Sequence, residues 1–158
     1  MKNRASELVK ELSGRSLTLA LGESMTCGLA ANRLNSRRGT KDVLAGSMVC
    51  YRPESKTRAL KVPAHVIRKF SAESQQVTDA MAKNLHRLFS ADIYAAITGL
   101  SAPGGSESRS KPVGTVFMSV WYRKKLFRKR KLFRGRPQQI KAKACEALFA
   151  LILDTIKS

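Results

Sequence analysis

The sequence predicts an α/β protein, a three-layer helix–sheet–helix sandwich with a mixed sheet. Segments with the apolar pattern of strands alternate with segments whose apolar residues recur at helical spacing. Late in the chain two strand candidates adjoin directly, which indicates an antiparallel hairpin beside parallel strands that are joined through helices. The 158 residues are 43% hydrophobic, enough to bury a core. No linker interrupts them, so we expect one domain over 1–158.

The first third of the chain alternates helix and strand. Apolar residues at helical spacing predict a helix over 4–13, and Gly14 is a suitable residue to end it. Alternating leucines predict a short strand over 17–21. A helix-like stretch then extends to Leu34, and a second strand is predicted over Val43–Tyr51. This order is typical of a parallel strand pair joined by a helix.

Two helices are predicted in the middle of the chain. Pro53 suits the first turn of a short helix that continues through Leu60. Ser71 is the expected cap of the next helix, with Ser74 near its start. An apolar stripe follows along that helix: Val77, Met81, Leu85 and Leu88.

The last third supplies the remaining strands and a long helix. A buried strand is predicted over Ile93–Thr98, followed by a loop rich in Gly, Ser and Pro over 101–112. Val113–Trp121 alternates as a strand, and the basic segment after it forms the second arm of a hairpin. Pro137 opens a helix with one apolar face: Ile140, Ala144, Leu148, Leu151 and Ile152.

The chain carries a formal net charge of +19, and residues 123–143 hold 11 of its 30 Lys and Arg residues and no acid. One interpretation is a surface for phosphates, of a nucleotide or of nucleic acid. The other is a solvated hairpin whose basic edge discourages aggregation between strands. We favour the second for most of these residues, because no nucleic-acid-binding signature accompanies them.

Composition excludes several classes of protein. No apolar run approaches the roughly 20 residues of a membrane helix, and no secretory signal is visible, so we expect a cytoplasmic protein without membrane contact. The three cysteines, Cys27, Cys50 and Cys145, form no CxxC pair and lie near no His cluster. This pattern argues against both a disulfide framework and a metal site.

Ser24 is the first candidate for chemistry, because it lies between the end of a strand and the expected opening of a helix. A hydroxyl there faces free backbone N–H groups that can stabilise an oxyanion. The alternative is that Ser24 or Thr26 only caps the helix, which geometry alone favours. His65 and His86 lie in predicted surface segments, so a Ser-His-Asp triad is not expected and lysine is the remaining base.

Two further segments lie at the ends of predicted strands, where ligands bind in many α/β proteins. Tyr51–Lys56 follows the second strand, and its Lys56 could point back to the sheet edge beside Ser24. The small residues of Thr98–Gly105 would let backbone N–H groups approach a phosphate or a carbonyl. Taken alone, a lysine on a short helix is usually solvated, and the loop matches no known nucleotide-binding fingerprint.

Together these segments resemble the CinA C-terminal domain family, whose characterised activity is that of a nicotinamide-nucleotide amidase. The family's elements occur in order from about residue 5 to the end of the chain. They appear as Gly22-Glu23-Ser24-Met25-Thr26-Cys27-Gly28, Tyr51-Arg52-Pro53-Glu54-Ser55-Lys56, Phe70-Ser71-Ala72-Glu73-Ser74-Gln75-Gln76-Val77, Thr98 through Gly105, and Lys111-Pro112-Val113-Gly114-Thr115-Val116.

The resemblance implies hydrolysis of nicotinamide mononucleotide to nicotinate mononucleotide and ammonia. Ser24 would be the nucleophile, Lys56 its general base, and Tyr51 would support proton transfer or position the lysine. A serine–lysine mechanism needs neither a metal nor an organic cofactor. The resemblance also implies a set of residues that bind the nucleotide substrate: Thr26, Gly28, Gly46, Thr98, Gly99, Gly104, Gly105, Gly135 and Arg136.

The chain departs from the family pattern at several positions: Met25 and Cys27 in the first element, Ser101 and Ala102 in the Thr98–Gly105 loop, and the acid-free segment Phe133-Arg134-Gly135-Arg136-Pro137. These changes indicate an altered substrate pocket. The alternative function is therefore a catalytically degenerate relative that binds a nucleotide, or nucleic acid through residues 123–143. We also expect a homo-oligomer, for which the last helix offers an apolar stripe.

Overall fold

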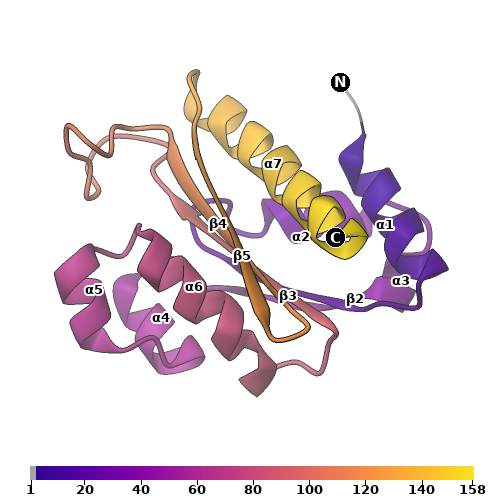
Figure 1. Ribbon diagram of the computed structural model, residues 1–158. Helices are drawn as coiled ribbons and strands as arrows, with labels where there is room; N and C mark the ends of the chain where they lie inside the picture. The colour runs from indigo at the N-terminus through magenta and orange to yellow at the C-terminus, as the bar shows by residue number, and fades with distance from the viewer. Residues whose placement is uncertain (1–2) are drawn as a thin grey trace.

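The computed structural model describes residues 3–158 and has a five-stranded mixed sheet between two layers of helices (Figure 1). The predicted α/β three-layer sandwich is thereby confirmed. The strands are β1 (Leu19–Glu23), β2 (Leu44–Val49), β3 (Ile93–Gly99), β4 (Thr115–Tyr122) and β5 (Lys125–Leu132).

The strand order is β2-β1-β3-β4-β5. β1 pairs in parallel with both β2 and β3, whereas β3–β4 and β4–β5 are antiparallel. Glu23, the last residue of β1, lies in register with Val49 of β2 and Ile97 of β3. The carboxyl ends of the three parallel strands therefore meet at one edge of the sheet, where α/β proteins commonly bind ligands.

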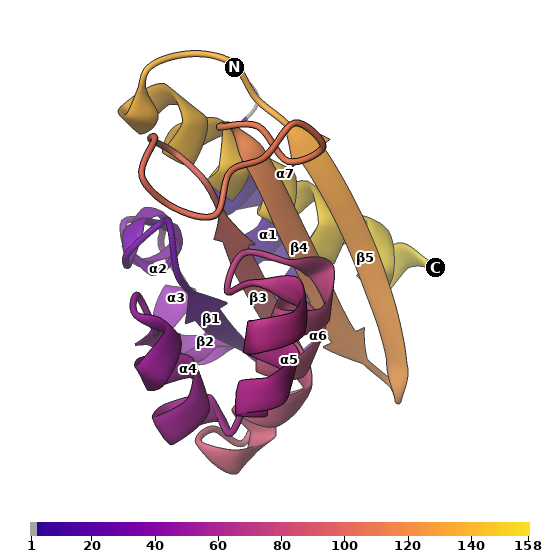
Figure 2. The ribbon, with the colours of Figure 1, turned by 90° about the vertical axis from the view of Figure 1, so that its left-hand side faces the viewer.

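Helices cover both faces of the sheet (Figures 1 and 2). One layer contains α1 (Arg4–Gly14), α2 (Leu29–Asn35), α3 (Thr40–Val43) and the long α7 (Pro137–Lys157). The other contains α4 (Pro53–Leu60), α5 (Ala64–Phe70) and α6 (Gln75–Asn84), which a short 3₁₀ turn at Leu85–Arg87 extends. Within residues 3–158 no helix combines the length and the apolar character that crossing a bilayer requires.

The larger core lies between the sheet and the layer of α1 and α7. Leu148, Phe149 and Ile152 of α7 are fully buried there against β3 and β4. The apolar stripe of α7, on which the expectation of a homo-oligomer rests, is thus occupied within the chain's own core. It offers no surface to a second copy, and the oligomeric state stays a prediction.

The structure corrects three details of the predicted helices. Ser74, not Ser71, caps α6, because its hydroxyl accepts the N–H of Val77 at 3.3 Å. Leu88 lies beyond α6 and is 42% exposed, so the apolar stripe ends at Leu85. α5 was not predicted from the sequence, because its seven residues include no fully buried side chain and so carry no apolar stripe.

The basic segment forms β5 and the start of α7, and its charges are divided between two faces of the sheet. Because β5 pairs antiparallel with β4, Arg128 and Arg130 lie on the α6 side, beside Ser119 and Phe117. Arg128 pairs there with Asp79 of α6, 2.7 Å away. Lys129 and Lys131 alternate to the α7 side. The segment is therefore not one continuous basic surface, and nucleic-acid binding through residues 123–143 stays a prediction.

The hairpin between β4 and β5 turns through Arg123 and Lys124, with φ angles of 49° and 61°. Two-residue turns with both central residues in this left-handed region favour Asn-Gly, because other side chains adopt it at a steric cost. We expect Arg123→Asn combined with Lys124→Gly to raise the free energy of unfolding by about 1 kcal/mol. Urea denaturation measures the change. Arg123→Ala combined with Lys124→Ala is the control for lost charge, and an equal gain in that variant would contradict the turn argument.

Candidate active site

The side chains of Ser24 and Lys56 meet at the edge where the parallel strands end. Ser24 directly follows β1, and Lys56 lies on α4, which begins just after β2. The Nζ of Lys56 is 3.0 Å from the Oγ of Ser24, within hydrogen-bonding distance. Two residues 32 positions apart thus form the nucleophile-and-base pair expected from the sequence.

Lys56 is fully buried, which is rare for a lysine without a carboxylate partner. Its Nζ has two further acceptors, the main-chain oxygens of Cys50 at 3.0 Å and Tyr51 at 3.5 Å. Burial lowers the pKa of Lys56 below its ordinary value, and the nearby charge of Glu73 opposes part of this fall. The folded protein therefore favours the neutral form of the Lys56 amine more strongly than bulk water does.

The contacts of Lys56 match a neutral amine acting as a base. A neutral amine has two N–H donors and one lone pair. The carbonyls of Cys50 and Tyr51 can accept the two N–H groups, which leaves the lone pair for the Ser24 hydroxyl. This arrangement activates a serine without a histidine.

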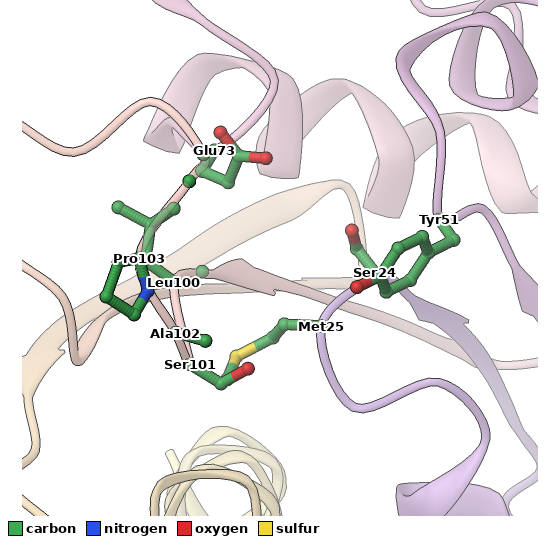
Figure 3. A pocket seen from close by; sticks show the side chains of 11 residues that line it. Ser24, Met25, Tyr51, Glu73, Leu100, Ser101, Ala102 and Pro103 are labelled. Atoms are coloured by element: carbon green, nitrogen blue, oxygen red, sulfur yellow. The ribbon is translucent and has the colours of Figure 1, made fainter. Parts of the chain in front are cut away.

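A cavity of about 240 Å³ opens beside Ser24. Ser24 and Tyr51 lie on one side and Leu100–Pro103 on the other, with Met25 between them and Glu73 at a third wall (Figure 3). The volume is slightly below the roughly 300–1,000 Å³ of typical small-molecule pockets. It suits a ring-sized portion of a ligand.

Ser24 lies in a turn and not at the opening of a helix, which corrects the sequence-based expectation. α2 begins only at Leu29, and the N–H of Ser24 donates to the main-chain oxygen of Ile97 at 3.2 Å. In the part of the chain that the structure describes, the N–H groups of Met25 and Thr26 have no acceptor. Of the two, Met25 directly follows the nucleophile and lines the cavity, so its N–H is the candidate donor to an oxyanion.

Neither Ser24 nor Thr26 caps α2; Glu23 does so. Its carboxylate is fully buried and accepts hydrogen bonds from five groups: the N–H groups of Gly28, Ala30 and Ala31, and the hydroxyls of Thr26 and Ser47. Glu23 therefore fastens the Ser24 turn to α2 and β2. Glu23 was not predicted as a functional residue from the sequence, although a carboxylate beside the candidate nucleophile and before a helix is a visible signal.

Besides Lys56, which contacts Ser24, the structure brings together five of the predicted site residues at the cavity. Four of them line the cavity with Ser24, and they are Tyr51, Gly99, Gly104 and Gly105. Tyr51 is 65% exposed, so its ring is open to solvent as well as to the cavity. At Gly99 a Cβ would lie 2.6 Å from the main-chain oxygen of Thr115 and 2.9 Å from the sulfur of Met25, which explains a glycine at the start of the loop.

Two of the predicted substrate-binding residues are buried behind the cavity instead of lining it. The Thr26 hydroxyl donates to Glu23 at 2.7 Å. Thr98 shares a hydrogen bond of 2.8 Å with Thr78 of α6. Both hydroxyls hold the framework of the site and do not face the space beside Ser24.

The other predicted substrate-binding residues also lie outside the cavity. Gly28 directs its N–H to Glu23, and Gly46 packs in β2 against the ring of Phe89. Gly135 and Arg136 lie between β5 and α7, where the Arg136 N–H donates to the Gln139 side chain at 2.8 Å. A direct role for these residues would require a ligand that reaches beyond the cavity.

The departures from the family pattern have different consequences. Met25, Ser101 and Ala102 line the cavity, so they change its surface. Cys27 does not line it; its side chain is exposed and its backbone has φ 49°. That left-handed conformation suits the glycine of the family pattern. The substitution at Cys27 therefore affects the turn and not the ligand-facing surface.

These features define the class of the protein as an α/β sandwich with a buried Ser–Lys pair at the carboxyl ends of its parallel strands. The model of the CinA C-terminal domain matches residues 1–156, and the chain belongs to this family.

Relatives of known sequence and relatives of known structure also belong to the CinA family by name. A putative competence-damage inducible protein from Moorella thermoacetica is 35% identical over 93% of this chain, and a CinA-like protein from Petrotoga mobilis is 36% identical over 90%. The chain spans only 35% of the length of each of these relatives. A competence-damaged protein (CinA) superfamily protein from Escherichia coli superposes with a TM-score of 0.89 at 28% identity, covering 96% of this chain and 87% of that one. A competence damage-inducible protein A from Klebsiella pneumoniae gives 0.90 at 28% identity, covering 97% of both chains.

Proposed function

We propose that this protein is an amidase that hydrolyses the carboxamide of a pyridine nucleotide, converting nicotinamide mononucleotide to nicotinate mononucleotide and ammonia. The observation that carries the proposal is the 3.0 Å approach of a fully buried lysine amine to the Ser24 hydroxyl at the wall of a cavity. The family resemblance supplies the substrate. The amidase uses neither a metal nor an organic cofactor.

The first half of the reaction forms an acyl-enzyme. Ser24 Oγ attacks the carboxamide carbon while Lys56 Nζ takes the hydroxyl proton. The N–H of Met25, which lines the cavity, stabilises the negative oxygen of the tetrahedral intermediate. The C–N bond then breaks, and Lys56 returns its proton to the departing nitrogen, which leaves as ammonia.

The second half releases the acid. Lys56, neutral again, takes a proton from a water molecule as its oxygen adds to the acyl carbon. The bond to Ser24 Oγ breaks, and the proton returns to that oxygen. Tyr51 contributes its main-chain oxygen, which helps to hold Lys56, and its ring forms one side of the cavity.

The pH profile of ammonia release tests this mechanism. Because Lys56 must be neutral to accept a proton, kcat/KM rises with pH and levels off above the pKa of Lys56. Burial lowers that pKa, so we expect the midpoint below 10.5, the ordinary value for lysine. Coupled detection of ammonia from nicotinamide mononucleotide measures the profile, and a midpoint at or above 10.5 would contradict the assignment.

The second candidate is a catalytically degenerate relative that binds a nucleotide without hydrolysing it. It is favoured by the altered lining of the cavity at Met25, Ser101 and Ala102. Binding of nicotinamide mononucleotide with no ammonia release by the unmodified protein would select this candidate.

A further inference from the structure

The cavity beside Ser24 contains one formal charge in its lining, the carboxylate of Glu73. Glu73 precedes α6 and is partly buried. Figure 3 shows it at the wall near Leu100, facing the same space as Ser24 and Tyr51. The proposed mechanism does not use this carboxylate.

Ser106 holds the carboxylate in place, and the charge of Lys111 lies near enough to interact with that of Glu73, although the two residues form no direct ion pair. The Ser106 hydroxyl donates to Oε2 of Glu73. Lys111 donates to Ser106 Oγ at 2.7 Å and to the main-chain oxygen of Glu73 at 2.9 Å, and not to the carboxylate. Within residues 3–158, Glu73 Oε1 accepts no hydrogen bond and Glu73 takes part in no salt bridge.

We propose that Glu73 makes this cavity selective for carboxamides whose ring carries a positive charge, such as a pyridinium, over neutral aromatic amides. The inference rests on the proposed function for the position of the amide, which must reach Ser24. With the carboxamide at Ser24, the ring occupies the remaining space, which Glu73 borders. A partly buried carboxylate without an ion-pair partner attracts a cation there more strongly than an exposed one does.

The negative charge of Glu73 also acts on Lys56. Among the charges around Lys56, that of Glu73 is the one that most opposes the lowering of its pKa by burial. A cationic ring between the two would be attracted to Glu73 while the neutral form of Lys56 adds no repulsion. The same carboxylate disfavours an anion in this cavity, so we expect a phosphate on the ligand to lie outside it.

Binding of two small probes to the Ser24→Ala variant tests the proposal without turnover. 1-Methylnicotinamide is a cation, and nicotinamide has the same ring and carboxamide without the charge. We expect the cation to bind about tenfold more tightly by calorimetric or NMR titration, as one favourable charge interaction of this kind implies. Adding Glu73→Gln, which retains an oxygen for Ser106, removes this preference.

Glu54→Gln is the matched control, because Glu54 is an exposed acid of α4 outside the cavity. We expect the preference for the cation to persist in that variant. Equal binding of the two probes, no binding of the cation, or a preference that survives Glu73→Gln would each overturn the proposal. If the preference is found but the unmodified protein releases no ammonia from nicotinamide mononucleotide, the amidase proposal fails and the role of Glu73 stands.

Discussion

We expect Ser24→Ala and Lys56→Met each to reduce kcat for the proposed amide hydrolysis by about a thousandfold or more, and the double variant to lose little beyond the worse single variant. In the proposed mechanism the first removes the attacking oxygen, and the second removes the group that accepts its proton. Because both act in the same step, their effects do not add, as is observed for residues that function as a unit. Single-turnover measurements of ammonia release give the comparison.

The control for Lys56→Met is Lys61→Met, which removes an exposed lysine just beyond α4. It should retain full activity. Losses that multiply in the double variant would show that the two residues act independently, and the Ser–Lys mechanism would then be wrong. Folding of each variant is checked by urea denaturation, so that lost activity is not confused with lost structure.

The sequence predicted the layers and all five strands because their apolar patterns are strong. β3, for example, was expected over Ile93–Thr98 and spans Ile93–Gly99. Local elements without such a pattern were missed, as in α5, which buries no side chain fully. The cap of α6 was placed at Ser71 and lies at Ser74, since both serines satisfy the same local rule and only the tertiary path of the chain separates them.

The site was predictable where it depends on strand ends and not where it depends on side-chain contacts. Parallel β1 and β2 place Ser24 and the segment before Lys56 at one edge, which the alternation of elements already implied. That Lys56 is buried and that Thr98 faces α6 follow from packing across the sheet. The role of Glu23 depends on five donors contributed by α2, β2 and the turn between β1 and α2, an arrangement that no local pattern displays.

Glu23→Ala should be the most destabilising single substitution near the site, lowering the free energy of unfolding by about 3–5 kcal/mol. Its carboxylate is fully buried, and its removal leaves three backbone N–H groups, those of Gly28, Ala30 and Ala31, without their acceptor. The hydroxyls of Thr26 and Ser47 can rotate to other partners, but backbone N–H groups cannot. Chemical denaturation monitored by circular dichroism measures the loss.

Two further variants separate the loss of the Glu23 hydrogen bonds from a general effect of mutation in the core. Ser47→Ala removes one donor from the same carboxylate and should lower the free energy of unfolding by only about 1 kcal/mol. Glu23→Gln keeps the shape but replaces one accepting oxygen with a donor, so its loss should lie between the two. Because Glu23 does not line the cavity, Glu23→Gln should lower kcat through the loosened Ser24 turn while KM changes little. If Glu23→Ala proved as stable as Ser47→Ala, the turn would be held by its own backbone and not by this carboxylate.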